Sequence, residues 1–367
     1  MNPTLTRRKF LSHLAVGTAG LALARHGFAS ISVPAKKENL GVALVGLGYY
    51  STDLLAPALQ RTSKCHLAGI VSGTPSKIET WQKKHAIPDA NVYTYDTFDS
   101  IANNPAIDVV YIVLPPSMHA EYTIRAAKAG KHVWCEKPMA PSVRECEEMI
   151  RACKDNNVTL AIGYRLQHEP NTQAVKKFAL DRKYGNVVSA AAEAGYFEGR
   201  TNHWKQKKAL GGGVMGDMGV YPLNALRYGT GMEPIAVSAQ ASTTRPEIYS
   251  EVEETMHFEL EFPGGVMGIG DVSFGKNMNK LHVDCANGWY ELAPFQSYNG
   301  VKGTTSDGAP LNATIPNQQA KQMDDDASAI INNTPLIAPG EEGLKDTIVV
   351  EAIYRSVAEG GKKVAIR

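Results

Sequence analysis

The segment 211–229, GGGVMGDMGVYPLNALRYG, places a carboxylate and a phenol four residues apart in a stretch with helical spacing. Residues at that spacing lie one turn apart on the same face of an α-helix, so Asp217 and Tyr221 are expected to be neighbours. A phenol beside charged groups can take up or release a proton during a reaction. The same spacing is also typical of an amphipathic helix whose buried tyrosine only has its hydroxyl satisfied. The elements around this segment decide between the two interpretations.

Near residue 40 the sequence has the pattern of a dinucleotide-binding unit. An apolar run over 41–46 is followed by Gly46-Leu47-Gly48-Tyr49-Tyr50-Ser51 and then by helical spacing of leucines and alanines. Gly46 suits a tight turn, Gly48 lets the backbone approach a pyrophosphate, and the helix N-terminus faces its negative charge. Ser51 replaces the third glycine and is still small. Because this pattern is weak by itself and also fits a plain strand–turn–helix, the interpretation depends on the strands that follow.

The end of the second predicted strand, over 66–71, indicates which dinucleotide is bound. An NAD site is expected to place an aspartate or glutamate there, to hold the ribose hydroxyls. Instead Ser72, Gly73 and Thr74 follow the strand, and Lys77 lies close behind them. Small polar groups and a lysine suit a 2′-phosphate, so the sequence favours NADP over NAD.

Two further predicted strands, over 109–114 and 132–135, each end in a polar or proline-bearing turn. In a doubly wound sheet the carboxyl ends of the strands line the ligand crevice. This rule places His119, Glu136 and Lys137 near the cofactor.

Beyond about residue 165 the alternation of strands and helices stops. Strand patterns follow one another over 186–197, 235–243, 253–262, 266–274, 280–285 and 289–292, before a last helix over 342–359. Runs of strands after a βαβ half are typical of an α+β domain. The predicted fold class is an α/β N-terminal Rossmann dinucleotide-binding domain over 30–163, followed over 164–340 by an α+β C-terminal domain with a large, mostly antiparallel open sheet. Residues 341–367 are expected to form a C-terminal helix that packs back on the Rossmann domain.

The first 29 residues have the features of an export signal. Arg7, Arg8 and Lys9 precede a mildly apolar stretch over 14–24, and Gly27-Phe28-Ala29 offers small residues at a cleavage site. This pattern predicts a twin-arginine signal peptide over 1–29 rather than a membrane span, because the apolar run is too short to cross a bilayer. We therefore expect a periplasmic protein.

Composition and charge narrow the class of protein. With 43% hydrophobic and 20% charged side chains among 367 residues, the chain has the composition of a globular protein and the length for two cores. A formal net charge of +1 argues against nucleic-acid binding. The five cysteines show no Cys-x-x-Cys or Cys/His spacing, so neither a metal site nor a disulfide framework is predicted.

Together these motifs resemble the Gfo/Idh/MocA oxidoreductase family, and within it the glucose–fructose oxidoreductase group. The resemblance runs from about residue 40 to the C-terminus. It is carried by the glycine-rich turn, the turns that follow the predicted strands, Ile162-Gly163-Tyr164-Arg165, the segment 211–229 and Pro339-Gly340-Glu341-Glu342-Gly343. The family usually has histidine at the position of Tyr221. Tyrosine there, together with the twin-arginine leader, is similar to the glucose–fructose oxidoreductase group.

The resemblance implies that Tyr221 transfers a proton and that Lys137 is its electrostatic partner, with a cis peptide bond between Lys137 and Pro138. Oxidation of a sugar hydroxyl needs a base for the O–H proton, and an unperturbed phenol, with a pKa near ~10, is rarely ionised at neutral pH. A neighbouring ammonium stabilises the phenolate, so Lys137 is expected to lower this pKa. Asp217 is expected to bind a sugar hydroxyl or to orient Tyr221.

The resemblance and the strand-end rule together nominate the residues that contact the cofactor. Trp204 and Lys205 match a Trp-Arg pair that covers the cofactor in the group, although lysine lacks the planar fork of arginine. Tyr298 is expected either to close the site from the second domain or to lie in a surface loop. The predicted cofactor-binding residues are Gly46, Leu47, Gly48, Tyr49, Tyr50, Ser72, Gly73, Lys77, Tyr95, Leu114, Pro115, Ser117, His119, Glu136, Lys137, Arg165, Trp204, Lys205 and Tyr298.

An NADP enzyme exported in folded form has no periplasmic pool of NADP(H) with which to exchange its cofactor. The expected activity is therefore a closed cycle with tightly bound NADP(H), in which an aldose such as glucose is oxidised to a lactone and a second sugar carbonyl takes the hydride. The alternatives are an NAD(P)-assisted glycosidase or epimerase of the same fold, a simple NADP-dependent aldose dehydrogenase or reductase, and a sugar-binding module that retains the cofactor. The expected partners are small-molecule sugars and other copies of the chain, in a homodimer or homotetramer built through the C-terminal sheet.

Overall fold

The computed structural model describes residues 37–298 and 300–367, and the predicted signal peptide over 1–29 lies outside the described residues. Six parallel strands form the first sheet, in the order β3-β2-β1-β4-β5-β6. This is the doubly wound order of a dinucleotide-binding domain, as the sequence predicts. The strands are β1 (Leu40–Val45), β2 (Cys65–Val71), β3 (Val92–Tyr93), β4 (Val109–Ile112), β5 (His132–Cys135) and β6 (Leu160–Ile162).

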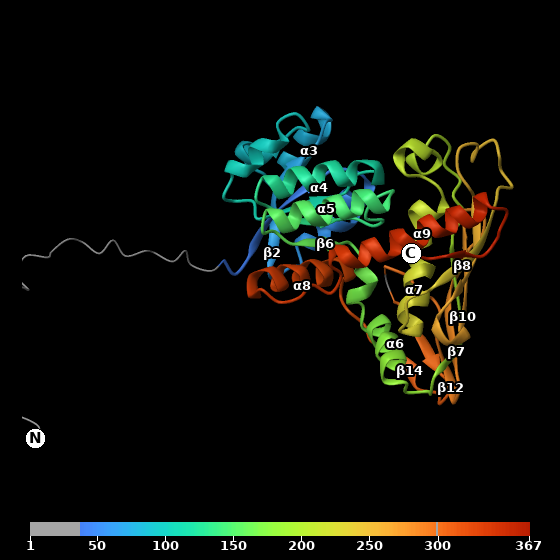
Figure 1. Cartoon of the computed structure of the whole chain (residues 1–367). Helices are drawn as coiled ribbons and strands as arrows, with labels where there is room; N and C mark the ends of the chain where they lie inside the picture. Colours follow the sequence, from blue (N-terminus) through green and yellow to red (C-terminus); the bar gives the residue numbers. More distant parts are fainter. Residues whose placement is uncertain (1–36, 299) are drawn as a thin grey trace, which may run out of the picture. The chain divides into compact units, whose positions relative to one another are not determined.

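Both faces of this sheet are covered, which explains why every residue of β1 is buried. Successive side chains of a strand point to opposite faces, so Ala43 and Val45 belong to one core and Val42 and Leu44 to the other. The helices around the sheet are η1 (Tyr50–Leu55), α2 (Ala56–Leu59), α3 (Pro75–His85), α4 (His119–Lys128) and α5 (Val143–Asp155). Figure 1 shows α4 and α5 lying side by side.

Two later helices return to the first sheet. Ala320, Met323 and Ala327 of α8 (Gln318–Asn332) pack in the same core as β1 and α2, although the sequence prediction assigned this stretch to the second domain. The last helix, α9 (Gly340–Ala358), packs on α5 and also on β8 (Ala236–Ser242) of the second sheet. The chain therefore returns to its first core before its last strand joins the second sheet.

Among the described residues, the second sheet has nine strands in the order β14-β13-β12-β11-β7-β10-β9-β8-β15. Only β7 and β10 pair in parallel, so the predicted mostly antiparallel open sheet is confirmed. Met256, Phe258 and Leu260 alternate along β9 toward one buried face. The strands are β7 (Val187–Gly195), β8 (Ala236–Ser242), β9 (Thr255–Glu261), β10 (Met267–Ser273), β11 (Met278–Cys285), β12 (Gly288–Leu292), β13 (Gly303–Thr305), β14 (Pro310–Leu311) and β15 (Val364–Ala365).

The buried face of this sheet lies against α7 (Val220–Thr230), which carries Tyr221. A π-helical turn, η8 (Met215–Gly219), leads into α7, and α6 (Pro170–Asp181) packs beside it. Within the described part of the chain, no helix has the length and apolar content needed to cross a bilayer.

Candidate active site

Lys137 and the helix that carries Tyr221 meet at the carboxyl ends of the first sheet. Lys137 follows β5, and its Nζ lies 4.6 Å from the centroid of the Tyr221 ring. The same Nζ donates to the backbone oxygen of Asp217 at 2.7 Å and lies 3.9 Å from its Oδ1. The Lys137–Pro138 peptide bond is cis, as the resemblance implies. The structure thus brings the three predicted catalytic residues together, with Lys137 in contact with both of the others.

The glycines before Tyr221 let the backbone fold tightly into this position. A Cβ on Gly216 would lie 2.3 Å from the backbone oxygen of Gly211, and one on Gly213, which has a φ of +103°, would lie 2.6 Å from the Glu253 carboxylate. Asp217 lies in the π-helical turn and Tyr221 in the first turn of α7, so the helix predicted to carry both residues begins with a π-helical rather than an α-helical turn. The sequence pattern does not distinguish a π-turn from an α-turn.

The electrostatic surroundings of Tyr221 favour its ionised form. Burial raises the pKa of the Tyr221 phenol, but the ammonium of Lys137 and the guanidinium of Arg165 outweigh burial and hold this pKa below its usual value. The Arg165 guanidinium carbon lies 5.6 Å from the centroid of the Tyr221 ring. Burial lowers the pKa of Lys137, but Tyr221, Asp217 and Glu136 together outweigh burial and raise this pKa above its usual value. Lys137 therefore stays protonated. The site therefore combines a phenol of lowered pKa with two cations.

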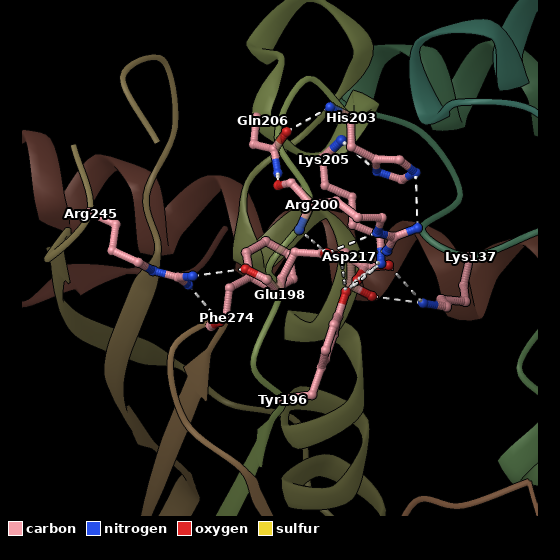
Figure 2. Close-up of polar contacts among 10 residues, drawn as sticks. All are labelled: Lys137, Tyr196, Glu198, Arg200, His203, Lys205, Gln206, Asp217, Arg245 and Phe274. Atoms are coloured by element: carbon pink, nitrogen blue, oxygen red, sulfur yellow. Dashed lines mark hydrogen bonds and ion pairs between the residues drawn. The ribbon is translucent and has the colours of Figure 1, made fainter. Parts of the chain in front are cut away.

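A second lysine holds Asp217, and Figure 2 shows the network that it belongs to. Lys205 Nζ lies 2.6 Å from Asp217 Oδ2 and 2.6 Å from the hydroxyl oxygen of Tyr196. Burial raises the pKa of Asp217, but Lys137 and Lys205 lower it below its usual value. The network continues from Tyr196 to Glu198 at 3.0 Å. The sequence nominated Lys205 only as a cofactor contact, whereas its partners within the described residues include the predicted catalytic carboxylate.

The glycine-rich turn after β1 has the features that a dinucleotide phosphate requires. Gly46 has a φ of +91°, and a Cβ there would lie 2.5 Å from the backbone oxygen of Val113. A Cβ on Gly48 would meet nothing within 4 Å, so the backbone is open to a ligand. Ser51, where a third glycine is usual, is buried and donates to the backbone oxygen of Gly46 at 2.6 Å. This turn fits the pyrophosphate of a dinucleotide.

The end of β2 fits a 2′-phosphate. Ser72 is buried, and its Oγ accepts from the backbone N–H of Thr74 at 3.2 Å. Gly73 lies against the Tyr95 ring, which a Cβ would approach to 3.0 Å. The exposed Lys77 lies in the first turn of α3, where there is no acidic residue. This end of the crevice therefore has a cation and hydrogen-bonding groups, and the first turn of α3 carries no carboxylate that would repel a phosphate.

His119 lies in the predicted place but has a different set of contacts. Its Nε2 lies 2.8 Å from the backbone oxygen of Leu114, and its Nδ1 lies 2.9 Å from that of Pro138. Burial lowers the pKa of His119. With its ring nitrogens beside backbone carbonyls, His119 links the turn after β4 to the turn after β5, next to Lys137. Leu114, Pro115 and Ser117 remain partly exposed along the same turn.

Arg165 and Tyr298 connect the second domain to the glycine-rich turn. The Arg165 guanidinium carbon lies 4.4 Å from the Tyr298 ring centroid, and the Tyr298 and Tyr50 ring centroids are 6.4 Å apart. Arg165 also donates to Ser297 O at 2.9 Å and to Gln318 Oε1. Tyr298 thus lies beside the predicted cofactor crevice. The contact from Gln318 had no sequence signal, because α8 itself was not predicted.

The other nominated residues are more peripheral. Leu47 is buried, Tyr49 is 65% exposed, and Trp204 lies beside His203 with ring centroids 5.9 Å apart.

A cavity of about 840 Å³ is lined by Pro138 and Gly216, neighbours of Lys137 and Asp217, but not by Tyr221. The cavity therefore lies alongside the candidate site rather than within it.

Metal chemistry has no support in the described residues. Over 37–298 and 300–367, no group of three or more His, Cys, Asp or Glu side chains could hold a metal ion. The five cysteines are unpaired, and four of them are buried.

Comparisons with known proteins agree with this geometry. The family model described as "Oxidoreductase family, NAD-binding Rossmann fold" matches residues 40–164, and that of the GFO/IDH/MocA C-terminal domain matches residues 172–291. The chain is similar to the crystal structure of aldose-aldose oxidoreductase from Caulobacter crescentus, with a TM-score of 0.85 and 40% identity over 89% of this chain and 99% of that one.

Two curated relatives are also sugar enzymes. D-xylose 1-dehydrogenase [NADP(+)] from Haloarcula marismortui is 28% identical over 86% of this chain and 90% of its own. D-xylose dehydrogenase from Paenarthrobacter nicotinovorans is 26% identical over 68% of this chain and 65% of its own.

Proposed function

Because the chain belongs to the Gfo/Idh/MocA oxidoreductase family, we propose that it is a periplasmic sugar oxidoreductase that keeps NADP(H) bound, oxidises an aldose and passes the hydride to a second sugar carbonyl. The observation that carries this proposal is the Lys137 ammonium 4.6 Å from the Tyr221 ring centroid, beside a crevice that fits a dinucleotide. The similarity to the aldose-aldose oxidoreductase supports the choice of two sugars.

The residues of the site supply the proton chemistry. When bound, NADP supplies a nicotinamide ring that accepts a hydride from a sugar carbon and returns it to another. Tyr221, whose pKa Lys137 and Arg165 lower, takes the proton of the sugar hydroxyl as the hydride leaves the same carbon. The protonated tyrosine then gives this proton to the carbonyl oxygen of the second sugar. Lys137 keeps its own proton throughout and stabilises negative charge on the reacting oxygens.

NADP rather than NAD is part of the proposal. Ser72 and Lys77 stand at the strand end where an acid would select NAD. The proposed export over residues 1–29 supports retention of the cofactor, because no exchange partner is available outside the cytoplasm.

We also propose that two or more copies associate through the outer face of the second sheet. Met267 and Ile269 of β10 are 40% and 41% exposed on this face, and Ile269 pairs with the exposed Ala191 of β7. Exposed apolar residues that gather on one face are typical of protein–protein contacts. Light scattering should give a dimer or tetramer, and Ile269→Glu should lower the mass. A monomeric wild type would refute the association.

The proposed function is tested in a single-turnover experiment with the cofactor-loaded protein. An aldose alone should reduce one equivalent of bound nicotinamide and then stop, and a second aldose or a ketose should reoxidise it. Continuous turnover that depends on added NADP⁺ would instead indicate a simple dehydrogenase, the activity named for the Haloarcula relative. No reduction, together with cleavage of a glycoside, would indicate the glycosidase alternative.

A further inference from the structure

Helix α8 buries a row of polar side chains. Gln318, Gln322 and Asp326 are spaced by four residues, so they lie on one face of the helix, and they are only 3%, 1% and 1% exposed. Gln319, beside them, is 2% exposed. Buried amides and carboxyls cost free energy unless they are hydrogen-bonded, so a buried face of this kind needs partners. We call these four residues the α8 polar row.

Many atoms of this row have no partner within the described residues. Gln319 Nε2, Gln322 Oε1 and both Oδ atoms of Asp326 accept or donate no hydrogen bond there. The same holds for Arg165 Nε, Gln167 Oε1 and His168 Nε2 in the short helix η5 (Arg165–His168), which packs on α8. Buried polar atoms in proteins are nearly always satisfied, often by ordered water. Donors and acceptors gathered between two packed elements are the lining that bridging waters need.

Two residues of the row, Gln318 and Gln322, connect to charged neighbours of the Lys137–Tyr221 pair. Gln322 Nε2 donates to the Tyr111 hydroxyl at 3.2 Å, and that hydroxyl donates to Glu136 Oε1 at 2.6 Å. Glu136 precedes Lys137 in the chain. Gln318 Oε1 accepts from Arg165, the second cation beside Tyr221. The α8 polar row therefore holds side chains on two sides of the proton-transfer pair.

Asp325, the residue before Asp326, is partly exposed to solvent. His168 Nδ1 lies 2.9 Å from Asp325 Oδ2. Asp325 also takes the ammonium of Lys321 at 2.6 Å, and its side chain is 24% exposed. Asp325 thus links the buried His168 ring to solvent.

Asp326 is the carboxyl group of the α8 polar row. Burial raises the pKa of the Asp326 carboxyl to about 7, with a further increase from Asp325, while His168 and the side-chain amide of Gln322 oppose the rise. The Cys65 thiol in β2 also lies close to this helix: burial raises its pKa, and the charges of Asp324 and Asp326 raise it further. A protonated Asp326 can donate to Gln322 Oε1. An ionised Asp326 can only accept, and it attracts the amide that otherwise donates to Tyr111.

We propose that Asp326 is a positioning residue for the proton-transfer pair. It acts through Gln322, Tyr111 and Glu136, the residue that precedes Lys137. Its use in catalysis rests on the proposed sugar oxidoreductase function. When Asp326 is protonated, it keeps the Gln322 amide hydrogen-bonded to the Tyr111 hydroxyl. Ionisation of Asp326 weakens that hydrogen bond, so the first hydride transfer should slow as pH rises through neutrality.

The test compares Asp326→Asn with Asp324→Asn. An asparagine at position 326 keeps the size of the side chain and can donate at every pH, so this variant should lose the inflection near pH 7 in the rate of nicotinamide reduction by an aldose. Asp324 lies on the same helix but binds the backbone N–H groups of Ser63 and Lys64, so its variant should keep the inflection. An unchanged inflection in Asp326→Asn would overturn the proposal.

Two further measurements keep the proposal testable. Gln322→Met should also abolish the inflection, which covers the case in which Asp326→Asn does not fold, and an inflection that survives would count against the relay. Carbon-13 NMR of carboxyl-labelled aspartate needs no activity: one resonance, absent from Asp326→Asn, should titrate near pH 7. An Asp326 resonance that stays ionised from about pH 5 to about pH 9 would refute the proposal even if no sugar is oxidised. A wild type that reduces no nicotinamide but shows this titration would count against the proposed function alone.

Discussion

The ammonium of Lys137 lies 4.6 Å from the centroid of the Tyr221 ring, although the two residues come from different domains. A cation held this close to a phenol stabilises the phenolate and lowers the pKa of Tyr221 below its usual value, as a base for a sugar hydroxyl requires. Asp217 does not share this role, because its carboxylate pairs with Lys205 at 2.6 Å. The predictions below separate these roles.

Tyr221→Phe should abolish sugar-dependent reduction of the bound cofactor while the cofactor remains bound. Removal of a positioned acid–base group typically costs ~10²–10⁴-fold in rate. The matched control is Tyr228→Phe on the same helix, which loses only a hydrogen bond to Glu342. Stopped-flow absorbance of the nicotinamide gives the rate. Rapid reduction in Tyr221→Phe would exclude Tyr221 as the base.

Lys137→Gln should shift the acidic limb of the pH–rate profile to higher pH. The ammonium lowers the Tyr221 pKa, so its removal raises that pKa, and the phenolate forms only in more alkaline solution. We expect a shift of about one pH unit or more. Lys205→Gln is the control, because its ammonium pairs with Asp217 and should move the profile less. Equal shifts in both variants would contradict a specific role for Lys137.

Lys77→Glu should weaken binding of NADP relative to NAD. The new carboxylate repels a 2′-phosphate at the end of β2, and loss of a charge-assisted contact should change the ratio of dissociation constants roughly tenfold or more. Fluorescence titration of the cofactor-free protein measures both constants, and Lys83→Glu near the other end of α3 is the control. Mass spectrometry of the denatured wild type should recover NADP(H); recovery of NAD alone would refute the assignment.

Asp326→Asn should stabilise the protein more at about pH 8 than at about pH 5. Because the folded-state pKa of Asp326 is raised to about 7, folding favours its protonated form, and the cost of the buried charge grows as pH rises from the unfolded pKa to about 7. A shift of about three units corresponds to about 4 kcal/mol when fully expressed. Urea unfolding of both proteins at the two pH values gives the difference. A variant that is destabilised equally at both would contradict the raised pKa.

Replacing Arg7 and Arg8 together with lysine should block export. The twin-arginine pathway reads the arginine pair, so the protein should remain in the cytoplasmic fraction with its leader uncleaved. Cell fractionation with immunodetection measures this outcome, and replacement of Lys9 with arginine should leave export intact. An unchanged periplasmic yield would remove the argument for a closed redox cycle.

Several parts of the fold could be read from the chain because their signals are local. The turn at Gly46 and Gly48, the strand-end motifs and the alternation along β9 each depend on residues within one or two elements. The short strands β13, β14 and β15 were not predicted, since two or three residues show no periodicity. Helix α8 was missed for another reason. It buries Gln318, Gln322 and Asp326 as well as Ala320, Met323 and Ala327, so its apolar stripe is weak.

The sequence by itself determined the two-domain architecture and the dinucleotide crevice, and it nominated Lys137, Tyr221 and Asp217 as catalytic residues, because glycines, strand ends and helical spacing are local consequences of backbone geometry. Only the tertiary structure decided what these groups touch. Lys205 pairs with Asp217, His119 faces two backbone carbonyls, and the α8 polar row reaches Glu136 and Arg165. Such contacts join residues up to about two hundred positions apart, and their energies depend on burial, which only the packed chain sets.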